Sequence, residues 1–228
     1  MVISTRRLDL LPEIDELRQL CQSLAMLDAI IMPRWDSRYY SFNARWGEET
    51  MLASMRNGSG DDYFILFTPT GAVIKGFDHE SPFAEPIAET GQLWSGVLDQ
   101  VPADFALALA DPALTPEWMT FCIWRHTHDP VWQIGAVTFP TDPDPYYGDA
   151  PDGSAQLLAI LDGDPRTYHS WAQEYYEDDT GALRVIPLPL VEHIYRHQPL
   201  SREIIAELNP MTTLTQLRVE IAEFGYPA

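Results

Sequence analysis

Two short apolar segments joined by a tight turn constrain the fold of this chain more than any other feature. Residues 63–68 (YFILFT) and 72–77 (AVIKGF) are rich in aromatic and β-branched side chains, which favour strands. The tripeptide PTG at 69–71 fits a type I turn followed by a left-handed glycine, a common hairpin loop. The sequence therefore predicts an antiparallel hairpin in which Thr68 pairs with Ala72.

Acidic residues stand at both open ends of this hairpin. Counting pairs back from the turn places the segment before the first strand opposite the segment after the second, with Asp62 facing Asp78 and Asp61 facing His79. Such a cluster suits a basic partner, through charge-assisted hydrogen bonds to Arg or Lys, and it also suits a hard divalent cation. We predict a partner-binding site, and no metal or catalytic residue, at the following positions: Asp61, Asp62, Asp78, His79 and Glu80.

The charge of the chain favours a basic partner. Asp and Glu number 34 against 14 Lys and Arg, for a net charge of −20, and Lys75 is the only lysine. A surface of this sign repels phosphate backbones, so nucleic-acid binding is not expected. It attracts basic proteins and speeds their encounter.

The two cysteines and the hydropathy of the chain predict a location. Cys21 and Cys122 lie about a hundred residues apart, with no CxxC or Cys/His metal-ligand spacing. Each falls in an apolar pattern, so we expect buried free thiols in a reducing compartment. The N-terminal segment lacks the apolar core of a signal peptide, and no apolar run reaches the roughly 18–20 residues of a membrane span. These features predict a cytoplasmic protein that has no contact with a membrane.

The remaining chain divides into a strand-rich part and a helical part. Apolar residues at helical spacing predict a helix over 12–31, and alternating aromatic residues predict two or three short strands over 35–56. A second hairpin is expected over 118–125 and 131–139. The following segment, TDPDPYYGDAPDGS at 141–154, is typical of a loop or hinge. We predict an α+β protein whose antiparallel sheet has about five to seven strands, in a domain over 1–140 and a helical C-terminal lobe over 153–228.

Helix caps mark the helices of the C-terminal lobe. Asp164 followed by proline begins one helix, and Ser201 begins another. Thr212 or Thr213 is expected to begin the last helix, which Gly225 ends.

No catalytic or cofactor-binding motif is complete. The chain has no GxSxG and no phosphate-binding GK[ST], so no cofactor is expected. His126 and His128 form an HxH pair, which on a strand points both imidazoles to one face. The pair resembles the start of the metallo-β-lactamase motif HxHxDH, but Pro130 and Val131 occupy the positions of the aspartate and the last histidine. We interpret the pair as a polar hairpin tip.

The opening hairpin and the segment after it resemble a known superfamily. ASMRNGSGDDYFILFTPTGAVIKGFDHES at 53–81 and WSGVLDQVPADFALAL at 94–109 are similar to the SUKH superfamily of bacterial immunity and interaction proteins. The resemblance implies an α+β fold with a curved sheet and a function in binding a protein, often a toxin. It identifies no functional residue beyond the hairpin.

Two functions follow as hypotheses. The first is a non-enzymatic protein-binding module, such as an immunity or inhibitor-like protein, whose acidic face binds a basic protein. The alternative is a metal-dependent hydrolase, in which a carboxylate activates water beside an ion. The alternative requires the two hairpins to converge, because its ligands come from both: Asp61, Asp78, His79, His126 and His128.

Overall fold

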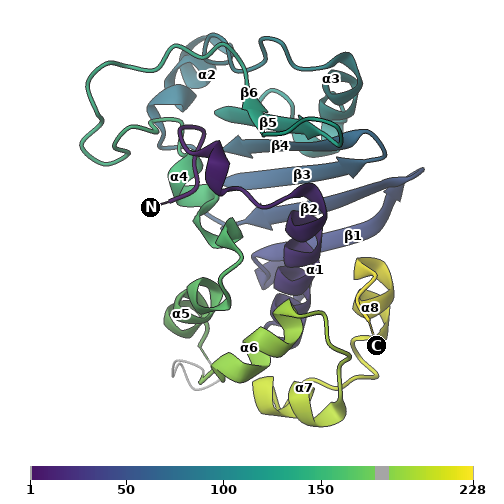
Figure 1. The fold of residues 1–228 in the computed structure, drawn as a ribbon. Helices are drawn as coiled ribbons and strands as arrows, with labels where there is room; N and C mark the ends of the chain where they lie inside the picture. Colours follow the sequence, from purple (N-terminus) through teal and green to yellow (C-terminus); the bar gives the residue numbers. More distant parts are fainter. Residues whose placement is uncertain (1, 178–184, 228) are drawn as a thin grey trace.

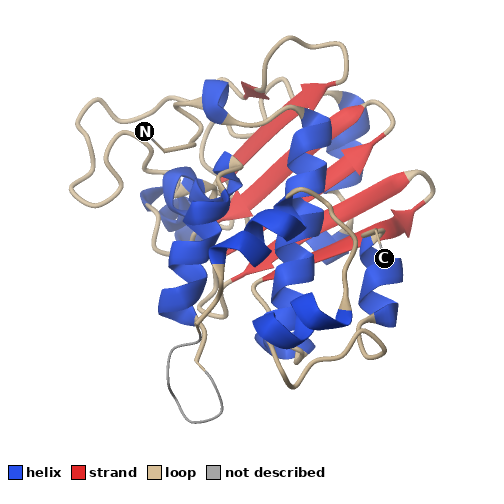
Figure 2. Ribbon diagram, turned by 60° about the horizontal axis from the view of Figure 1, so that its bottom comes forward, coloured by secondary structure: helices blue, strands red, loops and turns tan. Residues whose placement is uncertain are grey.

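A computed structural model describes residues 2–177 and 185–227 and confirms the α+β class. Within these residues, six antiparallel strands form one sheet, with helices on both of its faces (Figure 1, Figure 2). Each strand pairs with the next one along the chain, and the connections are short except for residues 78–120, between the fourth and fifth strands. The strands, in sheet order, are β1 (Tyr40–Gly47), β2 (Thr50–Arg56), β3 (Asp62–Thr68), β4 (Gly71–Phe77), β5 (Phe121–His126) and β6 (Gln133–Ile134).

Both faces of the central strands are buried, which explains their continuous apolar sequence. On β3, Tyr63, Ile65 and Phe67 point to the face that packs against α1 (Ile14–Ile31). Phe64 and Leu66 point to the opposite face, which is covered by α3 (Ala103–Leu109) and its flanking loops. Because strand side chains alternate between faces, one apolar run supplies both cores.

The predicted helix over 12–31 is confirmed and begins at Ile14. Every residue from 20 to 31 is buried, because the helix lies between the sheet and the C-terminal helices (Figure 1). From residue 165 onward the described residues contain four α-helices, and α6 and α8 pack directly against α1. They are α5 (Pro165–Tyr175), α6 (Leu188–Tyr195), α7 (Arg202–Leu208) and α8 (Arg218–Phe224).

The first hairpin forms as predicted, but its register is shifted by one residue. Thr68 pairs with Gly71, not with Ala72, so the loop contains two residues. Thr68 stabilises this tighter loop, because its hydroxyl accepts a hydrogen bond from the Gly71 N–H at 3.2 Å. Gly71 is required by a close approach to the next strand: a Cβ there would lie 2.1 Å from the carbonyl oxygen of Arg125.

The predicted second hairpin is largely wrong in its second strand. The first strand is present as β5, but only Gln133–Ile134 of the expected 131–139 pairs with it. At Gly135 the chain leaves the sheet and packs so closely on another loop that a Cβ would lie 1.9 Å from the Gly96 carbonyl oxygen. Trp94 donates a hydrogen bond to the Thr138 carbonyl at 3.3 Å, which holds the segment over this loop.

The region predicted to contain two or three short strands forms two. They are β1 and β2, preceded by a short 3-10 helix (Trp35–Ser37). The loop over 141–154 contains no helix or strand until α4 (Ser154–Leu157) begins at its end.

The predicted helix caps of the C-terminal half are confirmed with one exception. Asp164 accepts a hydrogen bond from the Arg166 N–H at 3.0 Å, and the Ser201 hydroxyl caps α7. Gly225 ends α8 in the left-handed conformation. The last helix, however, begins at Arg218, because the residues after Thr213 form a turn first. Among the described residues, none of the helices is long and apolar enough to cross a membrane.

Candidate functional site

Asp61 and His79 form a close pair between the start of β3 and the end of β4. The Asp61 Oδ1 atom lies 2.6 Å from His79 Nδ1 and accepts a hydrogen bond from the His79 N–H at 2.9 Å. Hydrogen bonding of the His79 ring to the Asp61 carboxylate raises the pKa of His79. Burial acts to raise the pKa of Asp61, but the hydrogen bonds from His79 and Asn57 outweigh it and lower the pKa. The predicted contact between these two residues is present, although the strands pair one residue out of the predicted register.

Asp78 is buried, at 5% exposure, and its carboxylate organises the turn after β4. It accepts hydrogen bonds from the backbone N–H groups of Glu80 and Ser81, each at 3.1 Å. The Tyr147 hydroxyl donates to the same oxygen at 3.0 Å, which ties the 141–154 loop to the sheet. Burial is the main reason why the pKa of Asp78 is raised. Glu80 beyond it is mostly exposed.

Asp62 does not belong to this cluster, which corrects the sequence prediction. In the observed register it pairs with Phe77, and it therefore points to the opposite face of the sheet from Asp61. There its carboxylate lies 3.2 Å from Nζ of the buried Lys75. Burial raises the pKa of Asp62 and lowers that of Lys75, so loss of water outweighs the attraction within the pair.

A cavity of about 350 Å³ opens beside the remaining acidic residues. Asp61, Asp78 and Glu80 belong to its lining, and five of the other twelve lining residues are aromatic. A carboxylate rim and ring faces together suit a cation, since the carboxylates supply opposite charge and the rings supply cation–π attraction. The aromatic lining residues are Tyr39, Tyr40, Tyr146, Tyr147 and Trp171.

The aromatic wall joins distant parts of the chain. Tyr40 begins β1 and Tyr39 directly precedes it, and their rings contact Trp171 of α5 at centroid distances of 5.0 and 5.3 Å. Tyr146 and Tyr147 come from the segment over 141–154, which the sequence predicted only as a loop or hinge. Sequence reasoning missed all five aromatic residues, because only the fold brings these segments together. The paired tyrosines in the Asp-rich loop were the one local signal.

Asp28 of α1 supports this wall from inside the protein. It is fully buried, and one carboxylate oxygen accepts hydrogen bonds from the N–H groups of Tyr39 and Tyr40, both at 2.9 Å. The other oxygen accepts from the Tyr168 hydroxyl at 3.0 Å. Burial raises the pKa of Asp28 to about 6, although these hydrogen bonds oppose the rise. The carboxylate therefore fixes the start of β1 at the cavity.

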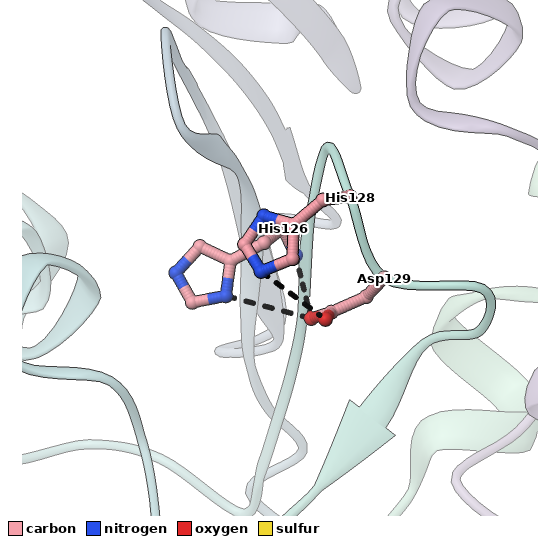
Figure 3. Close-up of side chains that lie close together, drawn as sticks. All are labelled: His126, His128 and Asp129. Atoms are coloured by element: carbon pink, nitrogen blue, oxygen red, sulfur yellow. Dashed lines mark hydrogen bonds and ion pairs between the residues drawn. The ribbon is translucent and has the colours of Figure 1, made fainter.

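The two histidines of the HxH pair lie at the other end of the sheet. His126 pairs with Gly71 at the beginning of β4, whereas Asp78 follows the last residue of β4. Seven residues of strand separate the two places, or roughly 23 Å. His126 and His128 lie beside Asp129 at the turn after β5, as expected for a hairpin tip (Figure 3). The two hairpins therefore do not converge, and the prediction of one metal site that combines His126 and His128 with Asp61, Asp78 and His79 is wrong.

No protein-family model, curated protein or solved structure matches this chain. The resemblance of residues 53–109 to the SUKH superfamily therefore stays a prediction.

Proposed function

We propose that this protein is a non-enzymatic binding module, of the immunity or inhibitor-like kind, for a basic protein. The observation that carries the proposal is the cavity in which Asp61, Asp78 and Glu80 meet a wall of aromatic rings. An Arg or Lys side chain of the partner would enter it, with its charge at the carboxylates and its stem along the rings. The net charge of −20 would steer such a partner to the surface.

The hydrogen bonds assign different roles to the three carboxylates. Asp78 is engaged by Tyr147 and by the turn that follows β4, so it shapes the cavity. Asp61 is oriented by His79, and Glu80 is exposed at the rim. We therefore expect Asp61 and Glu80 to contribute most of the attraction that changes when a partner binds. Asp62 contributes none directly, because it faces Lys75.

Two further observations support the proposed function and its compartment. The resemblance of the hairpin region to SUKH proteins points to the same class of function. Cys21 and Cys122 are both buried free thiols, which supports a reducing, cytoplasmic compartment.

A pair of peptides tests the proposal directly. One carries a single arginine between glycine and serine residues, and the other carries citrulline, which keeps the shape of arginine but has no charge. We expect calorimetric titration to detect binding of the arginine peptide and at least tenfold weaker binding of the citrulline peptide. Equal binding of both, or of neither, would contradict the proposed recognition of charge.

Matched variants locate the site. The double variant Asp61→Asn/Glu80→Gln removes two charges at the cavity, and Asp99→Asn/Glu207→Gln removes the same two charges at exposed positions elsewhere. We expect only the first to lose the arginine peptide, and to lose a protein partner captured from cell lysate. Equal loss from both would indicate a general charge effect in place of a site. Loss of binding on adding Mg²⁺ or Ca²⁺ would instead favour a cation at Asp61, Asp78 and His79, whose ligand atoms lie within 4.8 Å of one another.

A further inference from the structure

A second group of side chains with metal-ligand chemistry lies at the turn between β5 and β6. His126 is the last residue of β5, and His128 and Asp129 follow it in the turn. One ligand atom from each of the three lies within 4.8 Å of the other two. In Figure 3 both imidazole rings and the carboxylate gather on one side of the turn. The group lies at the far end of β4 from the cavity, so it is independent of the proposed function.

The distances in this group match those between the ligands of a small ion. His126 Nδ1 lies 3.4 Å from Asp129 Oδ2, and His128 Nε2 lies 3.7 Å from Asp129 Oδ1. Both are longer than a good hydrogen bond. Zinc bonds to nitrogen and oxygen of roughly 2.0–2.2 Å in a tetrahedron place neighbouring ligand atoms roughly 3.3–3.6 Å apart. Each imidazole therefore lies about one ligand–ligand distance from the carboxylate, His126 from Oδ2 and His128 from Oδ1.

Surrounding groups already hold the carboxylate in place. Asp129 Oδ2 accepts hydrogen bonds from Gln133 Nε2 at 3.0 Å and from the His126 N–H at 3.2 Å. The Asp129 backbone carbonyl accepts another from Arg125 Nε at 3.0 Å. Its side chain is 17% exposed, so it is ordered by the protein more than by solvent.

His126 has the environment of a metal-binding imidazole. Its Nδ1 faces Asp129, while Nε2 on the far side of the ring lies 3.5 Å from the Asp104 carboxylate of α3. A histidine ligand usually has its second nitrogen directed at a carboxylate or carbonyl, which orients the ring. Asp104 is itself held by the Thr70 hydroxyl at 2.8 Å, and Phe105 stacks on the His126 ring.

We propose that His126, His128 and Asp129 bind Zn²⁺. Two imidazoles and one carboxylate favour zinc over Mg²⁺ or Ca²⁺, which take oxygen ligands, and they leave a fourth position for water. The two rings are nearly parallel, 16° apart in plane with centroids 5.2 Å apart, so one ring must turn to direct its nitrogen at the ion. His128 is the ring that turns, because its side chain is 78% exposed. The bound ion would fix this turn against α3 through Asp104.

Calorimetric titration of the chelator-treated 228-residue chain with Zn²⁺ tests this site. We expect one ion per chain. The affinity should fall at least tenfold in His128→Ala, which removes an exposed side chain and leaves the fold intact, and also in Asp129→Asn. The control is His79→Gln, which removes the histidine of the other cluster and should leave the affinity unchanged.

Cobalt supplies a second measurement. Co²⁺ in a four-coordinate site absorbs visible light strongly, so we expect coloured protein from the parent and from His79→Gln, and loss of the colour in His128→Ala. Absence of Zn²⁺ binding, unchanged affinity in His128→Ala, or loss of binding in His79→Gln would each overturn the proposal.

Discussion

Replacing Asp28 by asparagine tests how its buried carboxylate affects the stability of the core beside the cavity. Asp28 is fully buried and accepts three hydrogen bonds, two from backbone N–H groups and one from the Tyr168 hydroxyl. Asparagine has nearly the same shape. Its oxygen can accept both backbone bonds, and its amide can donate to the Tyr168 oxygen after that hydroxyl rotates. The substitution therefore removes a buried charge and leaves the packing unchanged.

The expected effect depends on pH. Burial raises the pKa of Asp28 from 3.8 to about 6. The folded protein therefore binds a proton between about pH 4 and pH 6 that the unfolded chain does not hold. The stability that this proton contributes is fully present below about pH 4 and is lost as the pH rises through about 6. Because the pKa of Asp28 is higher by roughly two in the folded protein, the stability lost by neutral pH is about 3 kcal/mol.

Urea unfolding, followed by tryptophan fluorescence at several pH values from about 4.5 to about 7.5, measures this effect. We expect the free energy of unfolding of Asp28→Asn, relative to the parent, to increase by about 2–3 kcal/mol across this range. Other carboxylates titrate equally in both proteins and cancel. The exposed Asp99→Asn variant is the control and should show no such change. A difference between Asp28→Asn and the parent that is constant with pH would refute the reasoning.

Three further predictions concern the fold. Asp62→Asn should lower the free energy of unfolding by about 2–4 kcal/mol, because it leaves the buried ammonium of Lys75 without an opposite charge. The double variant Asp62→Asn/Lys75→Met should recover most of this loss. Urea unfolding of both variants and the parent measures the difference. Gly153→Ala should lower the melting temperature, because Gly153 has φ +80° and a Cβ there would lie 2.4 Å from Cβ of Asp78. The substitution should also loosen the loop over 141–154. A melting temperature equal to the parent's would contradict this prediction. Ser201→Ala should cost about 1 kcal/mol in urea unfolding, because it removes the cap of α7.

Local patterns in the sequence predicted most of the elements. The helix over 12–31 follows from apolar spacing alone, and the caps at Asp164 and Ser201 follow from single side chains. The first hairpin follows from its turn, but the register does not. Gly71 was interpreted as a turn residue, whereas the structure uses it for a close approach to β5. That contact lies more than fifty residues away in the sequence, so no local pattern reveals it.

The same limit explains the candidate site. Asp61 and His79 were predicted together because a hairpin sets their spacing, and the structure confirms them. Asp62 was misplaced by the shift of one residue, which moves a side chain to the other face of a sheet. The aromatic wall was missed, because Tyr39 and Trp171 meet only when a C-terminal helix packs beside β1.

The burial of α1 has a consequence for synthesis on the ribosome. The sheet pairs each strand with the next, so it can assemble as its segments emerge. The helix α1 is made before α6 and α8, which cover it and end about 165 and about 190 residues after it. At about 5–20 residues per second, the nascent chain exposes the apolar surface of α1 for about 10–40 s. During that interval, we expect the apolar surface of α1 to be accessible to chaperones that bind nascent polypeptides.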